Sequence, residues 1–178
     1  MQKAWRHFKT ITSHKLLVMK YCFRVGLYWQ GLCHDLSKYS WTEFRVGIRY
    51  YQGDRSPNAA EIDAVGYSSA WLHHKGRNKH HYEYWTDFAP MDERKVVCVE
   101  MPVRYVAEML MDRIAACRIY KGKAYTDRSP LEYYERGSQG ILIHENTRAL
   151  LETLLNMLAA EGEEKTLRYV RDTLLNKI

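Results

Sequence analysis

Apolar residues recur at helical spacing along much of the chain. Between Pro102 and Tyr120 they follow steps of three and four, which is the period of one helical face, and Gly122 ends the run. These apolar positions are Val103, Ala107, Leu110, Ile114 and Cys117. The pattern predicts a helix over 102–120.

The C-terminal third carries two leucine-rich runs that Gly162 separates. The first extends from Leu150 to Leu158 and the second from Leu167 to Leu175. Two such runs joined at a glycine predict a helical hairpin. Its leucines are expected in the core, or in a face through which the chain forms a homo-oligomer.

Three further segments carry signals for helix starts. Residues 40–43 and 129–132 both match the capping box, in which a Ser oxygen and a Glu carboxylate satisfy each other's free backbone donors. Ser56 and Pro57 predict the start of a run that continues to about His74, where Gly76 ends it. Each of these segments is therefore expected to open a helix.

Strand signals are scarce, so we expect an all-α fold. The segment 95–99 is the one strand candidate, and it is short. No repeat, low-complexity tract or linker divides the chain. We therefore expect one domain over 1–178, with a helical core over 1–125 and C-terminal helices over 126–178.

The composition is that of a globular protein. It is 46% apolar and 27% charged, with four cysteines that show no C-x-x-C spacing, so neither disorder nor a disulfide framework is indicated. The apolar stretch from Leu16 to Leu32 contains Lys20 and Arg24, which makes a membrane span too costly. No signal-peptide core precedes it. We expect a cytoplasmic protein with no membrane partner.

Positive charge and histidines gather in the same half of the chain. Residues 1–89 carry 13 Lys/Arg against 7 Asp/Glu, whereas 90–178 carry 14 against 14. Seven of the eight histidines also lie in the first half. This combination indicates an anionic ligand near a metal or acid–base site, with a solvated basic surface as the alternative.

The segment 32–38 contains the strongest local signal for chemistry. His34 and Asp35 offer nitrogen and oxygen ligands to one divalent ion, and Lys38 follows one turn later, where it can face an anion. Lys38 could instead pair with Glu43 at the helix junction. Asp112 falls on a mostly apolar flank of the 102–120 helix, where a carboxylate must be coordinated or paired. The alternative for Asp112 is a salt bridge to an arginine, Arg104 or Arg113.

Histidines and cations are most concentrated in 73–81. The nine residues contain four histidines (His73, His74, His80 and His81) and three cations (Lys75, Arg77 and Lys79). No cysteine pair and no H-E-x-x-H string accompanies them, so a zinc finger and a zincin are not indicated. The alternative is a basic patch that binds nucleic acid, and nearby aromatic residues would add stacking surfaces to it. These residues are Tyr67, Trp71, Tyr82, Tyr84 and Trp85.

His7 and His14 are candidates for a further ligand. On one helix, seven residues would place them on the same face but about 10 Å apart, so they cannot both bind one ion. Residues 10–13 are a candidate helix start that leaves His14 inside the helix. We therefore select His14 and expect His7 at the surface.

The order of His14, His34-Asp35, the paired histidines and Asp112 resembles the H…HD…H…H…D pattern of the HD-domain metal-dependent phosphohydrolase superfamily. Residues 31–44 and 73–85 are also similar to an uncharacterised bacterial and phage family related to that superfamily. The resemblance implies an HD-domain-like helical bundle that holds one or two divalent ions, of Mn, Fe, Zn, Co or Mg. It places His14, His34, Asp35 and Asp112 on the first ion, and it places His74 with His80 or His81 on the second.

The expected function is hydrolysis of a small phosphorylated substrate, a nucleotide or a similar phosphate ester. Asp35 would ligate the metal, with Asp35 and Lys38 forming the catalytic pair, and Lys38, Arg77 and Lys79 would neutralise the phosphate charge. Two alternatives stay open. One is a di-iron oxygenase on the same fold, and the other is a non-enzymatic nucleic-acid-binding module, which the sequence pI near 9.1 also suits.

Overall fold

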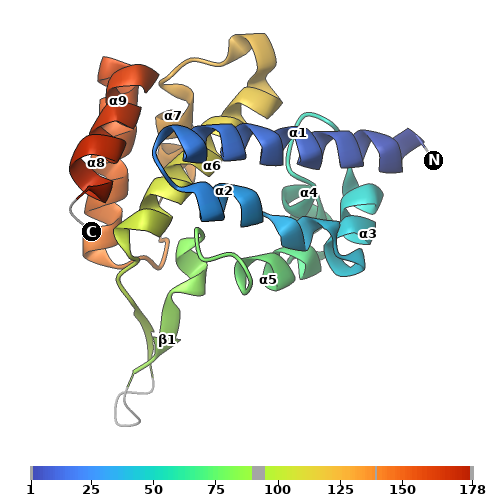
Figure 1. The fold of residues 1–178 in the computed structure, drawn as a ribbon. Helices are drawn as coiled ribbons and strands as arrows, with labels where there is room; N and C mark the ends of the chain where they lie inside the picture. Colours follow the sequence, from blue (N-terminus) through green and yellow to red (C-terminus); the bar gives the residue numbers. More distant parts are fainter. Residues whose placement is uncertain (1, 90–94, 139, 177–178) are drawn as a thin grey trace.

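The computed structural model describes residues 2–89, 95–138 and 140–176, and these residues form an all-α fold (Figure 1). The α-helices of the N-terminal part are α1 (Gln2–Arg24), α2 (Tyr28–Cys33), α3 (Trp41–Tyr50), α4 (Pro57–Val65) and α5 (Ser69–Lys75). Those that follow are α6 (Val103–Lys121), α7 (Ser129–Gly137), α8 (Glu145–Glu161) and α9 (Glu163–Tyr169). The prediction of an all-α fold is confirmed.

Short elements connect these helices. Single 3-10 turns lie at η1 (Leu36–Tyr39), η2 (Tyr82–Tyr84) and η3 (Gly122–Ala124), and a π-helical turn, η4 (Val170–Leu175), follows α9. The strands β1 (Thr86–Phe88) and β2 (Val96–Cys98) pair antiparallel, with Thr86 opposite Cys98 and Phe88 opposite Val96. The strand candidate at 95–99 is therefore confirmed. In Figure 1 this hairpin projects away from the helices.

The helix α6 is the centre of the core. Val106, Ala107, Leu110, Met111 and Ile114 are fully buried on it, because α1, α7 and α8 pack around it. The helix ends as the sequence predicts, at Gly122, whose φ of 53° is one that glycine adopts readily. A central helix that touches both halves of the chain can bring distant side chains to one place.

The C-terminal hairpin also forms as predicted, and Gly162 separates α8 from α9. The side chains of Leu151, Leu154, Leu155 and Leu158 are fully buried against the rest of the chain. These leucines were expected either in the core or in a face that forms a homo-oligomer, and the structure places them in the core. None of the helices in the described ranges is both long and apolar enough to cross a membrane.

The prediction of one continuous helix from Pro57 to His74 is wrong, because the segment forms two helices, α4 and α5. Gly66, with φ of 84°, ends α4, and the Ser68 side chain then accepts a hydrogen bond from the backbone N–H of Trp71 to begin α5. The turn lets α5 change direction. That change matters for the site, because α5 carries His74.

The two predicted capping boxes mark helix starts, but neither forms the predicted pair of hydrogen bonds. At α3 the Glu43 carboxylate accepts from His73 and His74, and Ser40 makes no capping bond. At α7 the Ser129 hydroxyl accepts from the backbone N–H of Thr126 instead. At α3 contacts with a distant helix thus replace the capping bonds, and at α7 a local turn before the helix does so.

The expectations for the start of the first helix and for His7 are both wrong. The helix α1 begins at Gln2 rather than within 10–13, so His7 and His14 share it. His7 is buried, with 5% of its surface exposed, because its ring packs against Phe44 and occupies the space beside Gly47. A β-carbon on Gly47 would lie only 2.0 Å from His7 Nε2, so glycine is required there.

Candidate metal centre

The segment that joins α2 to η1 carries His34 and Asp35, and both are buried. Asp35 has φ of 55° and ψ of 22°, in the left-handed region, and it is the one non-glycine residue with positive φ among the described residues. Aspartate tolerates this conformation better than most residues, but it still costs free energy, and such strain concentrates at functional sites. The turn brings His34 Nε2 and Asp35 Oδ2 within 3.3 Å of each other.

Two more helices complete a first group of donors around Asp35 Oδ2. His14 Nε2, from α1, lies 3.4 Å from Asp35 Oδ2 and 2.9 Å from Asp112 Oδ1, from α6. His34 Nε2 lies 3.5 Å from the same Asp112 oxygen. The structure therefore brings together His14, His34, Asp35 and Asp112, as the sequence predicted.

Asp112 does not form the arginine salt bridge that was the alternative. Its ion-pair contacts within the described residues are with His14 and His34. Although burial by itself would raise the pKa of Asp112, hydrogen bonds from these histidines hold that pKa well below its usual range. The carboxylate is therefore ionised at the centre of the site.

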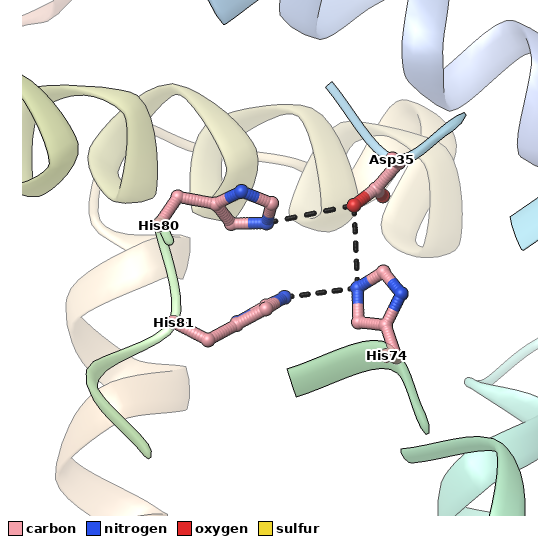
Figure 2. A group of neighbouring side chains, drawn as sticks. All are labelled: Asp35, His74, His80 and His81. Carbon is pink, nitrogen blue, oxygen red and sulfur yellow. Dashed lines mark hydrogen bonds and ion pairs between the residues drawn. The ribbon is translucent and has the colours of Figure 1, made fainter. Parts of the chain in front are cut away.

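The other oxygen of Asp35 faces a second group of donors (Figure 2). Asp35 Oδ1 lies 3.2 Å from His74 Nε2, on α5, and 3.5 Å from His80 Nε2. His81 Nε2 lies 3.0 Å from His74 Nε2. The donor atoms of these four residues all lie within 4.8 Å of one another, so Asp35 is common to both groups.

The structure also decides which members of the histidine pairs face this centre. His74, His80 and His81 belong to the second group, whereas His73 Nδ1 pairs with Glu43 at 2.6 Å. Residues 74 and 80 are buried, with 1% and 2% of their surfaces exposed. The histidines of 73–81 therefore do not form the exposed basic patch of the nucleic-acid alternative.

The distances between the donor atoms fit the coordination of divalent metal ions, and most of these atoms have no partner outside the two groups. Two ligand atoms about 2.1 Å from one ion lie roughly 3.0–3.4 Å apart at tetrahedral or octahedral angles, and the donor contacts here measure 2.9–3.5 Å. Four buried atoms, His14 Nε2, His34 Nε2, His80 Nε2 and Asp35 Oδ1, have no partner in the described residues except other members of the two groups. Asp35 Oδ2 has one further partner, the ammonium of Lys38. Buried polar atoms without partners are costly, and coordination would satisfy them.

Two buried glutamates orient the histidines, and the sequence analysis did not assign either to the site. Glu108 Oε1 lies 2.9 Å from His34 Nδ1 and 3.1 Å from His80 Nδ1. Glu43 Oε2 lies 2.8 Å from His74 Nδ1. Because an ionised carboxylate only accepts hydrogen bonds, each Nδ1 donates its proton, and the Nε2 lone pairs are left facing the centre.

Glu108 could have been found from helical spacing. It precedes Asp112 by four residues on α6, so both lie on the same helix face. Glu43 offered no such signal, because its position matched a capping box. Its role depends on α5, which lies about thirty residues further along the chain.

The charges at this centre favour a bound cation. Burial opposes ionisation of Asp35, but His34 and Lys38 hold the pKa of its carboxyl well below the usual range. Burial likewise lowers the pKa of His34, but Asp35 raises it above the ordinary value overall. Burial and the neighbouring charge of His80 hold the pKa of His81 well below the usual range. The carboxylates therefore hold positive charge at this centre, which is a proton on His34 when no ion is bound and which a metal ion would replace. His81 is already neutral, as a metal ligand must be.

The donor groups open into a cavity of about 750 Å³. His14, His74, His81 and Asp112 line it, together with Lys38, whose ammonium lies 2.6 Å from Asp35 Oδ2. Lys38 thus pairs with Asp35 rather than with Glu43. The volume is within the range of small-molecule sites in proteins.

Arg77 and Lys79, which the sequence analysis assigned to substrate binding, lie outside this cavity. Arg77 is exposed and donates to the backbone oxygen of His73, and Lys79 is exposed over the ring of Tyr84. Neither is among the lining residues of the cavity. The lining cations besides Lys38 are Arg55, Arg113, Lys121 and Arg136, which the sequence analysis did not select.

Comparison with known proteins gives one finding. No curated protein and no solved structure matches the chain. A family model matches residues 3–157, which include every residue of both donor groups. The chain belongs to that family, the family of unknown function DUF5662.

Proposed function

We propose that this protein is a metal-dependent phosphohydrolase that acts on a nucleotide or a related phosphate ester. The observation that carries the proposal is the position of Asp35. Its two oxygens face two separate groups of buried nitrogen and oxygen donors, so one carboxylate can bridge two ions.

The residues that would hold the ions are the members of the two groups. His14, His34, Asp35 and Asp112 would hold the first, and Asp35, His74, His80 and His81 the second. Bound there, divalent ions supply a Lewis acid for a phosphoryl oxygen and lower the pKa of bound water toward about 7.

The chain's own groups prepare this centre. Glu108 and Glu43 fix the ring orientation and the tautomer of His34, His80 and His74 before any ion arrives. Lys38 would orient the phosphate at the mouth of the site through its ammonium, and it neutralises part of the negative charge there.

The cavity supports a nucleotide-like substrate. Its wall includes the aromatic side chains of Trp71, Tyr82, Tyr120, Tyr133 and Tyr134 in addition to the cations. Aromatic rings offer stacking surfaces to a base, and cations offer charge to a phosphate. The positions that carry the resemblance to the HD-domain superfamily also meet at one centre, which supports assigning the protein to that type.

Metal analysis followed by an activity screen tests the proposal. The protein is purified without added metal, its metal content is measured, and phosphate release is assayed on phosphate esters with Mn²⁺, Co²⁺, Mg²⁺ and Fe²⁺. We expect two ions per chain at saturation and metal-dependent phosphate release. The variant D112N should lose one ion, because Asp112 belongs only to the first group.

The variant D35N should lose both ions, because Asp35 is the shared ligand. Asparagine also tolerates the left-handed backbone of this position, so the variant keeps the local fold. The exposed Asp87→Asn, at a residue that does not line the cavity, is the matched control and should retain both ions.

Two results would favour one of the alternative functions, a di-iron oxygenase or a nucleic-acid-binding module, over the phosphohydrolase. Iron-dependent oxygen consumption without phosphate release would identify an oxygenase. Salt-sensitive binding of nucleic acid that D35N leaves intact, with no metal bound in the wild-type protein, would identify a binding module.

A further inference from the structure

The cations of the cavity differ in whether an acid already neutralises them. Lys38 pairs with Asp35 at 2.6 Å, Arg55 with Asp63 at 2.6 Å, and Lys121 with Glu132 at 3.1 Å. For Arg113 and Arg136, no carboxylate of residues 2–89, 95–138 or 140–176 lies within ion-pair distance. The cavity therefore contains two arginines whose charge has no partner in the described chain.

Both arginines line the same cavity, Arg113 half-buried and Arg136 exposed. Arg113 is on α6 with its guanidinium 5.6 Å from the ring centre of Tyr134, and Arg136 is on α7 with its guanidinium 6.0 Å from that of Tyr133. Burial raises the pKa of Cys117, and the charges of Lys121, Arg113 and Arg136 oppose this rise. The charges of all three cations therefore act on one residue that lines the cavity, Cys117.

The Arg113 side chain is also oriented by its surroundings and keeps a free hydrogen-bond donor. Its Nε is buried and makes no hydrogen bond to the described residues, although it can donate one. Contact with the Tyr134 ring restricts the guanidinium plane, so less entropy is lost when it binds an anion. Glu83 lines the same cavity without reaching ion-pair distance of Arg113, and burial raises the pKa of its carboxyl, which reduces its repulsion of an anion.

We propose that Arg113 and Arg136 form a second anion subsite, which binds a phosphate group that is not cleaved. The assignment of a substrate rests on the proposed function, whereas the subsite itself rests on the arginines. Arg113 follows Asp112 directly on α6, so an extended substrate can reach both the metal centre and the subsite. The substrate class is then a nucleotide with at least two phosphate groups, rather than a monophosphate.

Binding of inorganic pyrophosphate tests the subsite without any activity. The full-length protein is stripped of metal with a chelator, and pyrophosphate binding is measured by titration calorimetry. We expect the double variant R113Q/R136Q to lose about tenfold or more in affinity, which corresponds to 1.4 kcal/mol. Arg104→Gln is the matched control, because Arg104 is exposed on the same helix and does not line the cavity.

The variant R113K guards against a folding defect. It keeps the charge but not the two-pronged geometry of the guanidinium, so it should fold normally and bind with intermediate affinity. Unchanged pyrophosphate affinity in R113Q/R136Q would overturn the subsite. If K38M lost affinity for pyrophosphate and the arginine variants did not, the anion would bind at the candidate metal centre. That result would also overturn the arginine subsite.

Turnover separates the subsite from the proposed function. In R113Q/R136Q, kcat/KM should fall about tenfold for a nucleoside diphosphate and stay nearly constant for the matching monophosphate. Equal losses for both substrates would show that the arginines bind the cleaved phosphate and would overturn the subsite. If no phosphate ester is hydrolysed at all, the proposed function fails, while the pyrophosphate measurement still decides the subsite.

Discussion

The ammonium of Lys38 lies 2.6 Å from Asp35 Oδ2, the same oxygen that faces His14 and His34. Burial disfavours a charged lysine here, but Asp35 raises the pKa of Lys38 above its ordinary value. The ammonium therefore stays charged beside the candidate metal centre, close to where the proposed phosphate would bind.

The variant K38M should keep its full metal content and lose activity. Lys38 is not a ligand, but its charge would stabilise a phosphate, so we expect kcat/KM for a phosphate ester to fall at least about tenfold, or 1.4 kcal/mol. Metal content, melting temperature and turnover are to be measured on one preparation. Unchanged turnover per bound metal would remove Lys38 from the site.

The variant E108Q should weaken metal binding without unfolding the protein. Glu108 Oε1 accepts from both His34 and His80, and the amide oxygen of glutamine, which carries no negative charge, is a weaker acceptor for both Nδ1 protons. Loss of such an orienting carboxylate typically reduces metal affinity by about 10–100-fold. Competition with a metal-binding dye measures the affinity, and the exposed Glu135→Gln is the control. Equal affinity in both variants would contradict the orienting role.

The variant G47A should destabilise the protein, against the usual effect of this substitution in a helix. Alanine normally gains about 0.5–1 kcal/mol over glycine in a helix interior. Here the added β-carbon would lie 2.0 Å from His7 Nε2, and such overpacking costs about 1–3 kcal/mol. Denaturant unfolding measures the change.

Two further variants isolate the contact between His7 and Gly47. At Gly137, within α7, an added β-carbon meets nothing within 4 Å, so G137A should not destabilise the protein. The double variant G47A/H7A should recover stability relative to G47A alone. Failure to recover would mean that the clash is not with His7.

The stability of the protein should fall as the pH decreases from 6.5 toward 4, and His7 should cause part of this fall. Burial, with a smaller contribution from the charge of Lys38, lowers the pKa of His7 to about 4. Because the unfolded chain takes up this proton near pH 6.5 and the folded chain does not, the stabilisation is complete above pH 6.5 and is lost below it.

The size of this effect follows from the shift. Each pH unit below 6.5 removes about 1.4 kcal/mol, so roughly 2 kcal/mol is lost between pH 6.5 and 5. Urea unfolding of the wild type and of H7L at both pH values gives the difference. If H7L shows the same pH dependence as the wild type, another group is responsible.

Local patterns were sufficient to predict several features of the fold and the site. The period of three and four residues located α6, and Gly122 and Gly162 marked the ends of helices, because both signals depend on the backbone of a few neighbouring residues. The charge of Asp112 on an apolar flank pointed to a buried centre for the same reason. A helix repeats its faces regularly, so a misplaced carboxylate is visible in the sequence.

Only the tertiary structure decided which partners the polar groups choose. Glu43 contacts His73 and His74 rather than capping its own helix, and His7 is buried because Gly47 leaves room for its ring. The cations that line the cavity are likewise not those of 73–81. These outcomes depend on contacts between residues 30 or more positions apart. The free energy of such a contact depends on the packing of whole helices, which no local pattern of residues contains.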